Sequence, residues 1–339
     1  MPDVPLGDGP DARGPTTKPL VRQEVKTILI ACIVSIMLTT SLSWAVRADR
    51  RPGDNAGRRF DEPQSVATPR LAPREVLTDE VDPRLVNEVI SSITLVRNHE
   101  QADALIAKCL VSDAPQIISF LNAHGLNVCY RNSEFTAAVL QSDIILRDGI
   151  GMQLLFKALK RDAGLNMNGT DLIPEILNRA RGHTVGILGT SEPYLSKAAE
   201  LLKQAGHNVI LCADGFKGAT SYLTLIEQYR PRVIVLAMGM PKQELVALYL
   251  KENASYNPII INGGAVVDFI AGKVQRAPRW MRQISMEWVY RLMNEPKRLF
   301  KRYVIGNLVF LLRIKDIRKS YFPTLDGEVW AFENGCRVS

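Results

Sequence analysis

The chain has 339 residues, of which 46% are hydrophobic and 23% charged, so it is long enough for one large or two small domains with a substantial core. Its five cysteines form no C-x-x-C pair and its four histidines show no ligand spacing, which argues against a disulfide framework and predicts no metal site. The net charge of +7 is regional, because residues 273–319 carry 13 basic and three acidic side chains. A local anionic partner is therefore favoured over a general affinity for nucleic acid.

The first 83 residues are predicted to contain a tail, a membrane span and a linker. Residues 1–26 are rich in Pro, Gly and Asp, which is typical of a disordered tail. Residues 27–46 carry no formal charge, and a helix of this length covers about 30 Å, the thickness of a bilayer core. We expect a transmembrane helix here. A cleaved signal peptide is the alternative, but its apolar stretch would span only about 7–15 residues. Residues 47–83 mix Arg, Asp, Glu and Pro and predict a linker.

The charges beside this span bear on its orientation. Four basic residues lie within 20 positions before it and five lie within 20 positions after it. This small excess, together with the reducing compartment that the unpaired cysteines favour, predicts a C-terminal domain facing the cytoplasm from the inner (cytoplasmic) membrane.

Residues 84–272 alternate between short apolar runs and helical patterns. A helical segment reaches about Leu140, an amphipathic helix covers 193–206, and another helix starts at Pro241. Continuously apolar strands between helices indicate an α/β, Rossmann-like fold, in which a parallel sheet carries helices on both faces. The predicted strands are 117–122, 143–148, 183–190, 208–214, 232–238 and 258–264.

Two polar residues at strand ends are the candidate catalytic residues. Open parallel sheets bind ligands beyond the carboxyl ends of their strands. Asn122 follows the first predicted strand, where it is either a turn former or a functional side chain. Asp148 follows the next strand and precedes a helix, which it could simply cap. A carboxylate at this edge also suits a general base.

Small residues follow the later strands and are candidates for binding a diphosphate and a sugar. Turns of this kind let backbone amides approach a diphosphate at a helix N-terminus, although the spacing is not a complete dinucleotide fingerprint and equally fits a tight turn. Pro241 fits the first position of a helix, whose first turn would direct Gln243 and Glu244 to the cleft or leave them as caps. The candidates are Gly186, Gly189, Thr190, Gly239, Pro241, Gln243, Glu244, Gly263, Gly264 and Asp268.

Residues 273–320 form a basic segment in which Lys and Arg alternate with aromatic residues beside an apolar run at 303–312. The pattern favours an amphipathic appendage lying on an anionic membrane. Single-stranded nucleic acid is a less favoured alternative, and a core helix with a basic solvent face is a third. Residues 321–339 are predicted to be a tail. Arg276, Arg298 and Arg302 are the candidates for contacting the membrane, since a guanidinium binds phosphate bidentately.

Five segments in this order resemble the WecG/TagA/CpsF family, glycosyltransferase family 26, over about residues 88–318. The resemblance implies a Rossmann-like catalytic core with a membrane-meeting appendage, a UDP-sugar donor, an acceptor sugar linked to undecaprenyl diphosphate, and inverting transfer without metal or cofactor. The segments are DGIG (148–151), NGTDL (168–172), GMPKQE (239–244), NGGAVVDFIAGKVQRAP (262–278) and EWVYRLMNEPKRLFKRY (287–303).

The resemblance also implies roles for particular residues. Asp148 matches the proposed catalytic base, and Asn122 matches the Asn of an early Thr-x-Asn motif. The glycines and the pair Gln243 and Glu244 match donor-site positions, while Arg298 and Arg302 match the basic appendage that holds the lipid diphosphate. Phe120 stands where the family has Thr, which puts the identity of the substrate in doubt more than the activity.

Rival functions remain open at this point. The main alternative is a nucleotide-sugar-binding protein without transferase activity that acts in assembly for polysaccharide export. Phe120, which replaces the family's Thr, is compatible with this alternative. An NAD-dependent oxidoreductase is disfavoured by the incomplete glycine fingerprint, and a nucleic-acid-binding module is the least favoured. The sequence leaves open the transferred sugar, the acceptor sugar and whether the protein forms a homo-oligomer.

Overall fold

The computed structural model describes residues 81–283 and 286–321, with four two-residue strands between residues 324 and 337. The tail predicted at 1–26, the transmembrane helix predicted at 27–46 and nearly all of the linker predicted at 47–83 lie outside these residues. Within the described ranges, no helix is long and apolar enough to cross a bilayer.

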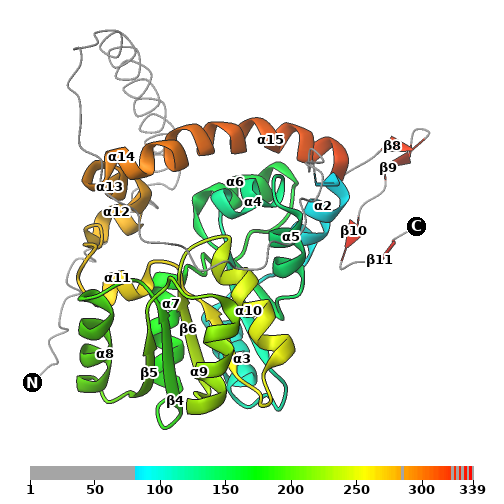
Figure 1. Ribbon diagram of the computed structural model, residues 1–339. Coiled ribbons are helices and arrows are strands. Elements are labelled where there is room, and N and C mark those ends of the chain that lie inside the picture. Colours follow the sequence, from blue (N-terminus) through cyan, green and yellow to red (C-terminus); the bar gives the residue numbers. More distant parts are fainter. Residues whose placement is uncertain are drawn as a thin grey trace, which may run out of the picture. The chain divides into compact units, whose positions relative to one another are not determined.

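A parallel sheet of seven strands forms the centre of the protein (Figure 1). The strands lie in the order β1-β3-β2-β7-β6-β4-β5, and each adjacent pair is parallel. The predicted α/β fold with a parallel sheet is therefore confirmed. The strands are β1 (Ile93–Thr94), β2 (Gln116–Leu121), β3 (Ile144–Arg147), β4 (Thr184–Gly189), β5 (Asn208–Ala213), β6 (Val233–Ala237) and β7 (Ile259–Asn262).

Helices cover both faces of the sheet because successive strand residues point to opposite sides. In β6, Val233 and Val235 pack with α3, α7, α8 and α11, whereas Ile234 and Leu236 pack with α9 and α10. A further apolar cluster joins α2, α4, α5 and α6 to the C-terminal helix α15 (Gly306–Tyr321). The core helices are α2 (Pro83–Ser91), α3 (His99–Leu110), α4 (Ala123–Cys129), α5 (Ser133–Leu140), α6 (Gly149–Ala158), α7 (Gly169–Arg179), α8 (Tyr194–Gln204), α9 (Ala219–Tyr229), α10 (Lys242–Asn253) and α11 (Val266–Ile270).

Local sequence explains where α5 begins, and the structure differs from the sequence-based expectation at Pro241 and at β1. The helical segment expected up to about Leu140 consists of two helices, α4 and α5. The break occurs because Asn132 caps α5, accepting a hydrogen bond from the Phe135 backbone N–H at 2.7 Å. Pro241 occupies the N-cap position of α10 and not the first helical position. The two-residue strand β1 was not predicted, because it is too short to show a pattern.

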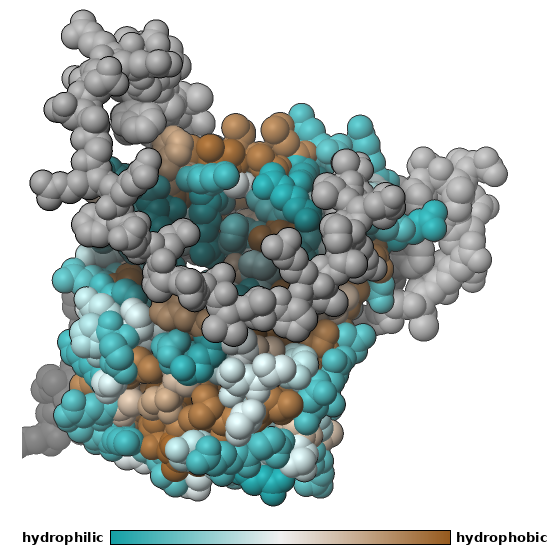
Figure 2. All heavy atoms as spheres, viewed as in Figure 1, coloured by the Kyte–Doolittle hydropathy of each residue, from teal (hydrophilic) through white to brown (hydrophobic). Residues whose placement is uncertain are grey.

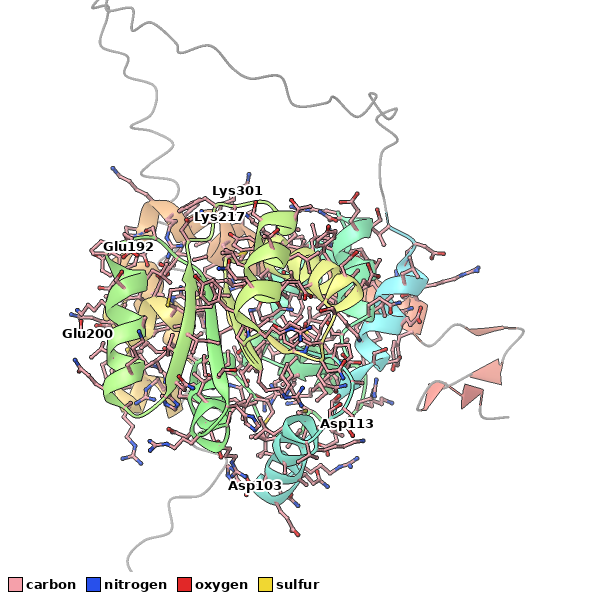
Figure 3. All side chains as sticks on the ribbon, turned by 60° about the horizontal axis from the view of Figure 1, so that its bottom comes forward. Asp103, Asp113, Glu192, Glu200, Lys217 and Lys301 are labelled. Carbon is pink, nitrogen blue, oxygen red and sulfur yellow. The ribbon has the colours of Figure 1, made fainter. Side chains whose placement is uncertain are left out.

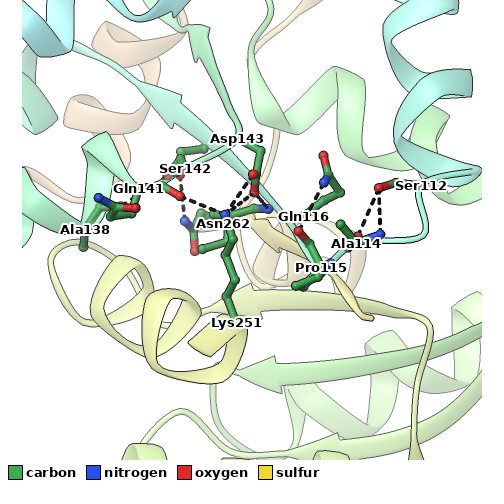
Figure 4. A network of polar contacts seen from close by, with 12 residues as sticks. Ser112, Ala114, Pro115, Gln116, Ala138, Gln141, Ser142, Asp143, Lys251 and Asn262 are labelled. Carbon is green, nitrogen blue, oxygen red and sulfur yellow. Dashed lines mark hydrogen bonds and ion pairs between the residues drawn. The ribbon is translucent and has the colours of Figure 1, made fainter. Parts of the chain in front are cut away.

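A polar network fixes β2 against its neighbours (Figure 4). Asp143 accepts a hydrogen bond from the backbone N–H of Ile117 at 2.7 Å and pairs with Lys251 of α10 at 2.7 Å. The buried Asn262 of β7 donates to Ser119 of β2 at 2.9 Å. These contacts hold β2, β3 and β7 in register, so the strand ends that carry Asn122 and Asp148 are held rigidly side by side.

The basic segment folds as a row of helices across the carboxyl ends of the strands (Figure 1). The last helix, α15, packs on α4, α2 and α6 through buried side chains that include Phe310 and Ile317. The elements are α12 (Arg279–Gln283), α13 (Glu287–Asn294), α14 (Pro296–Phe300), the π-helical turn η1 (Lys301–Ile305) and α15 (Gly306–Tyr321). Four two-residue strands follow: β8 (Thr324–Leu325), β9 (Glu328–Val329), β10 (Phe332–Glu333) and β11 (Cys336–Arg337). We call residues 273–320 the appendage.

Candidate functional site

A cavity of about 320 Å³ lies between the carboxyl ends of the strands and the appendage. Its floor contains Asn122, Asp148, Thr190 and Asn262, which end or follow four of the parallel strands, and its cover contains Arg291, Arg298 and Arg302. Figure 3 shows Lys217 and Lys301 at one end of the molecule and Asp103 and Asp113 at the other. Because its floor is formed at the carboxyl ends of the parallel strands, the cavity occupies the position where open parallel sheets bind ligands.

Asp148 and Asn122 form a hydrogen-bonded pair in this cavity. The Asn122 amide donates to the Asp148 carboxylate at 3.3 Å, and its own oxygen accepts from the Gly125 backbone N–H, capping α4. Asp148 lies at the N-cap position of α6, but its side chain makes no capping hydrogen bond. The alternative that Asp148 simply caps its helix is therefore excluded, and the carboxylate faces the cavity.

The protonation of Asp148 reflects opposing effects. Enclosure by the protein raises the pKa of Asp148, because it disfavours the charged carboxylate. The hydrogen bond from Asn122 and the positive charge of Arg302 lower the pKa again. Burial is the largest of these effects, so the pKa of Asp148 stays above its usual value. A carboxyl group with a raised pKa, beside an oriented amide, suits general acid–base chemistry near neutral pH.

The turn after β4 brings a hydroxyl into the cavity. Gly189 has φ +146°, and a Cβ at this position would lie 2.3 Å from the Ala237 carbonyl oxygen, so only glycine fits between β4 and β6. The next residue, Thr190, donates through its hydroxyl to Asp268 at 2.5 Å, and Lys273 pairs with the same carboxylate at 3.3 Å. Thr190, Asp268 and Lys273 thus form one hydrogen-bonded cluster in the cavity wall.

Gln243 links two of the glycine turns. Its side-chain oxygen accepts from the backbone N–H groups of Gly239 at 3.2 Å and Gly264 at 3.0 Å, so its amide nitrogen must point the other way. That nitrogen donates to Glu244 at 2.9 Å. Gln243 lines the cavity, whereas Glu244 is 3% exposed and lies behind it. Burial raises the pKa of Glu244 to about 7.

Four basic side chains and two carboxylates are among the described residues that line the cavity. Arg298 is paired with Glu295 at 2.5 Å. The Nε atoms of Arg291 and Arg302 are buried, and neither has a hydrogen-bond partner among the described residues. A buried guanidinium nitrogen without a hydrogen-bond partner is costly, so this arrangement favours an anionic ligand.

The structure separates the predicted site residues into two sets. Of the other residues predicted, Arg276 is held by Asp171 and by Glu287 at 3.3 Å, outside the cavity lining. Gly186, Gly189, Pro241 and Glu244 also lie outside the lining, and a Cβ at Gly186 would lie 3.0 Å from the Pro231 side chain. The predicted residues that share the cavity are Asn122, Asp148, Thr190, Gly239, Gln243, Gly263, Gly264, Asp268, Arg298 and Arg302.

Several lining residues were missed by the sequence analysis. Lys273 and Arg291 belong to the basic segment, and the position of Arg291 seven residues before Arg298 in that segment was a usable signal. Phe216, in the loop after β5, lines the cavity although it is 78% exposed. No sequence pattern distinguished this phenylalanine from an ordinary loop residue.

Comparison with known proteins agrees with this arrangement. A family model described as the glycosyl transferase WecG/TagA/CpsF family matches residues 89–322, a range that includes both the sheet and the helices over the cavity. The chain is also similar to N-acetylglucosaminyldiphosphoundecaprenol N-acetyl-beta-D-mannosaminyltransferase of Bacillus spizizenii, with 26% identity over 204 residues, 59% of this chain and 79% of the relative. The chain therefore belongs to the WecG/TagA/CpsF family of glycosyl transferases, which confirms the resemblance seen in its motifs.

Proposed function

We propose that the protein transfers a sugar from a UDP-sugar to a sugar linked to undecaprenyl diphosphate, in the synthesis of a cell-surface polysaccharide. The observation that carries the proposal is the cavity in which the Asp148 carboxylate lies among four basic side chains. The name of the Bacillus relative specifies a diphosphoundecaprenol acceptor and an N-acetylmannosaminyl donor group. An N-acetylmannosamine-like sugar or another hexose is the proposed donor sugar.

The proposed reaction is a single displacement with inversion. Asp148 accepts the proton of the acceptor hydroxyl as the oxygen attacks the anomeric carbon, and the bond from that carbon to UDP breaks. Asn122 orients the base, because its amide bonds the carboxylate while its oxygen is fixed at the start of α4. A positioned base of this kind contributes about 10²–10⁴-fold to the rate.

The basic side chains supply the other part of the proposed mechanism. The leaving UDP and the lipid diphosphate both carry negative charge, and preorganised donors stabilise such charge most in a site that excludes water. Lys273 lies beside Thr190 and Asp268, and we place the donor diphosphate there, near the glycine turns. Arg298 and Arg302, on the appendage, are placed against the lipid diphosphate. In this proposal, neither phosphate group requires a metal ion.

We further propose that the appendage lies on the membrane. Exposed apolar side chains gather along α15 (Figure 2), and they include Leu308 at 60%, Leu311 at 46% and Leu312 at 57% exposure. Basic residues follow in the last turns of the same helix. Apolar residues beside cations suit an anionic lipid surface. The proposed location is the inner membrane, with the catalytic domain facing the cytoplasm.

The experiment that tests the function measures UDP release from a panel of UDP-sugars in the presence of membrane vesicles that carry lipid-linked acceptor. The variant is Asp148→Asn, which removes the base but keeps the shape of the side chain. We expect acceptor-dependent release from one donor to fall by about 10²–10⁴-fold in this variant.

The matched control is Asp113→Asn, the same chemical change at an exposed residue before β2. This variant should release UDP at the wild-type rate. Asp113 precedes β2, whereas the cavity residue Asn122 follows β2 at its other end, and Figure 3 shows Asp113 far from Lys301 of the appendage. UDP binding without release from any donor would refute the transferase and favour a non-catalytic nucleotide-sugar-binding role. Equal activity of Asp148→Asn and wild type would remove Asp148 from the mechanism.

A further inference from the structure

The helix that closes the cavity contains a π-helical turn. α14, η1 and α15 follow one another without a gap, and the Gly306 N–H donates to the carbonyl of Lys301, five residues earlier. A π turn holds one more residue than an α turn, and one residue corresponds to about 100° of helical rotation. The π turn therefore changes the direction of the side chains before it, measured relative to the side chains after it, from the direction they would have in a regular α-helix.

This turn separates the part of the appendage that reaches the cavity from the part that packs on the core. Arg302 lies in η1 and lines the cavity. Phe310 lies in α15, is 2% exposed, and packs on the cluster formed by α4 and α6. The direction of Arg302 thus depends on whether the π turn is kept while α15 stays docked.

Asn127 of α4 contacts the helix directly after this turn. Its amide nitrogen donates to the Gly306 carbonyl at 2.7 Å, and its amide oxygen accepts from the Arg313 guanidinium at 2.8 Å. Asn127 is 6% exposed, and the Arg313 guanidinium also lies over the Tyr130 ring at 4.4 Å. A buried amide whose two ends are both satisfied by one neighbouring helix fixes the position of that helix.

The same short helix also carries the partner of the candidate base. Asn122 begins α4 and bonds Asp148, while Asn127 lies in the last turn of α4 and bonds Gly306. One rigid element therefore spans from the carboxylate to the π turn that bears Arg302. We propose that Asn127 is a positioning residue, which holds η1 against α4 and so sets Arg302 beside Asp148 in the cavity. The proposal concerns the transferase reaction and rests on the proposed function.

The first test does not depend on activity. Asn127→Leu keeps the approximate size of the side chain and removes both hydrogen bonds, and hydrogen exchange is measured on the backbone amides of residues 301–306. We expect exchange about tenfold faster than in wild type, the effect of losing hydrogen bonds of ordinary strength. Unchanged exchange in this segment would overturn the proposal.

Asn87→Leu is the matched control for this test. Asn87 of α2 donates to Ser320 at 3.3 Å, so this variant also removes an asparagine contact between the core and α15, but far from η1. Exchange at residues 301–306 should stay at the wild-type rate. An equal increase in both variants would mean general loosening of α15, and would also overturn the proposal.

The second test follows the pH dependence of UDP release. The charges that act on Asp148 are Arg302 and Arg147, which lower its pKa, and Glu287, which raises it. If Arg302 moves away, the pKa of Asp148 rises, so the acid limb of the rate profile moves to higher pH. We expect this shift in Asn127→Leu and in Arg302→Gln, with no further shift in the double variant.

A merely structural role of Asn127 gives a different result. An acid limb at the wild-type position in Asn127→Leu, or shifts that add in the double variant, would contradict the proposal, because loss of stability alone does not change the pKa of the base. If the wild-type protein releases UDP from no donor, the proposed function fails, and the hydrogen-exchange comparison still decides the position of η1.

Discussion

Glu244 offers a sharp test of how the cavity wall is held. Its carboxylate is 3% exposed, one oxygen accepts from Gln243, and the other has no hydrogen-bond partner among the described residues. We expect the substitution Glu244→Gln to keep the contact with Gln243, because the new amide still presents an oxygen, and to remove a buried ionisable group.

The magnitude follows from the pKa of Glu244. Burial raises this pKa from 4.5 to about 7, so the folded protein binds the proton more tightly than the unfolded chain does. The stability of the wild type therefore falls as the pH rises from 4.5 to 7, and the full loss is present above pH 7. At about 1.36 kcal/mol per pH unit, the loss is about 3 kcal/mol.

The assay is denaturant unfolding of the variant and the wild type at pH 5 and pH 8. We expect Glu244→Gln to be more stable than wild type by up to about 3 kcal/mol at pH 8, and by less than about 1 kcal/mol at pH 5. The control Glu200→Gln, at an exposed residue of α8 (Figure 3), should stay within about 0.5 kcal/mol at both pH values.

A gain of equal size at both pH values, or a loss at pH 8, would refute this reasoning. The same variant also tests the role of Glu244 in catalysis. Because Glu244 lies behind Gln243 and outside the cavity lining, the KM for the donor should stay at the wild-type value. A large rise in this KM would instead return Glu244 to the set of residues that touch the donor.

Three further predictions concern the cavity and the appendage. Phe216→Ala should raise the KM for the UDP-sugar about tenfold. The exposed ring at the cavity edge suits stacking on a base, an interaction worth about 1–3 kcal/mol, so Phe216→Tyr should leave this KM unchanged. Gly189→Ala should lower the free energy of unfolding by about 1–3 kcal/mol more than Gly182→Ala, because both glycines have positive φ but only Gly189 would clash with Ala237; equal losses would contradict this. Replacing Leu308, Leu311 and Leu312 by Ser should release the protein fragment 81–321 from anionic vesicles in a flotation assay, and retained flotation would contradict the proposed membrane face.

Much of the fold was predictable because β2, β3, β4, β6 and β7 are buried along nearly their whole length. Such strands are mainly apolar in sequence, as is typical of a parallel sheet covered on both faces. The positions of Asn122 and Asp148 followed from the same pattern, since the residue after a buried strand lies at the carboxyl edge of the sheet. Their mutual hydrogen bond follows from the pairing of β2 with β3.

Contacts that depend on tertiary packing were not predictable in this way. Arg276 looks like a free cation in the sequence, yet it is held by Asp171 of α7 and Glu287 of α13, outside the cavity lining. The pair of Arg298 and Glu295 is different, because these residues are only three positions apart in the sequence. Glu244 follows Gln243 directly, and only the packing of α10 shows that one faces the cavity and the other does not. Residue type and spacing do not specify which charges meet across separate elements.

The negative and positive charges in the cavity come from different parts of the chain. The carboxylate of Asp148 belongs to the core, whereas Lys273, Arg291, Arg298 and Arg302 all belong to the appendage. Burial is the main effect that lowers the pKa of Arg302, and the charges of Arg291 and Arg298 lower it further, so these cations repel one another when no ligand is bound. A diphosphate that binds only the closed arrangement offsets this repulsion and stabilises that arrangement by mass action. The proposed substrates should therefore favour closure themselves, and the base should meet its acceptor only once the negative charge of the substrates is in place.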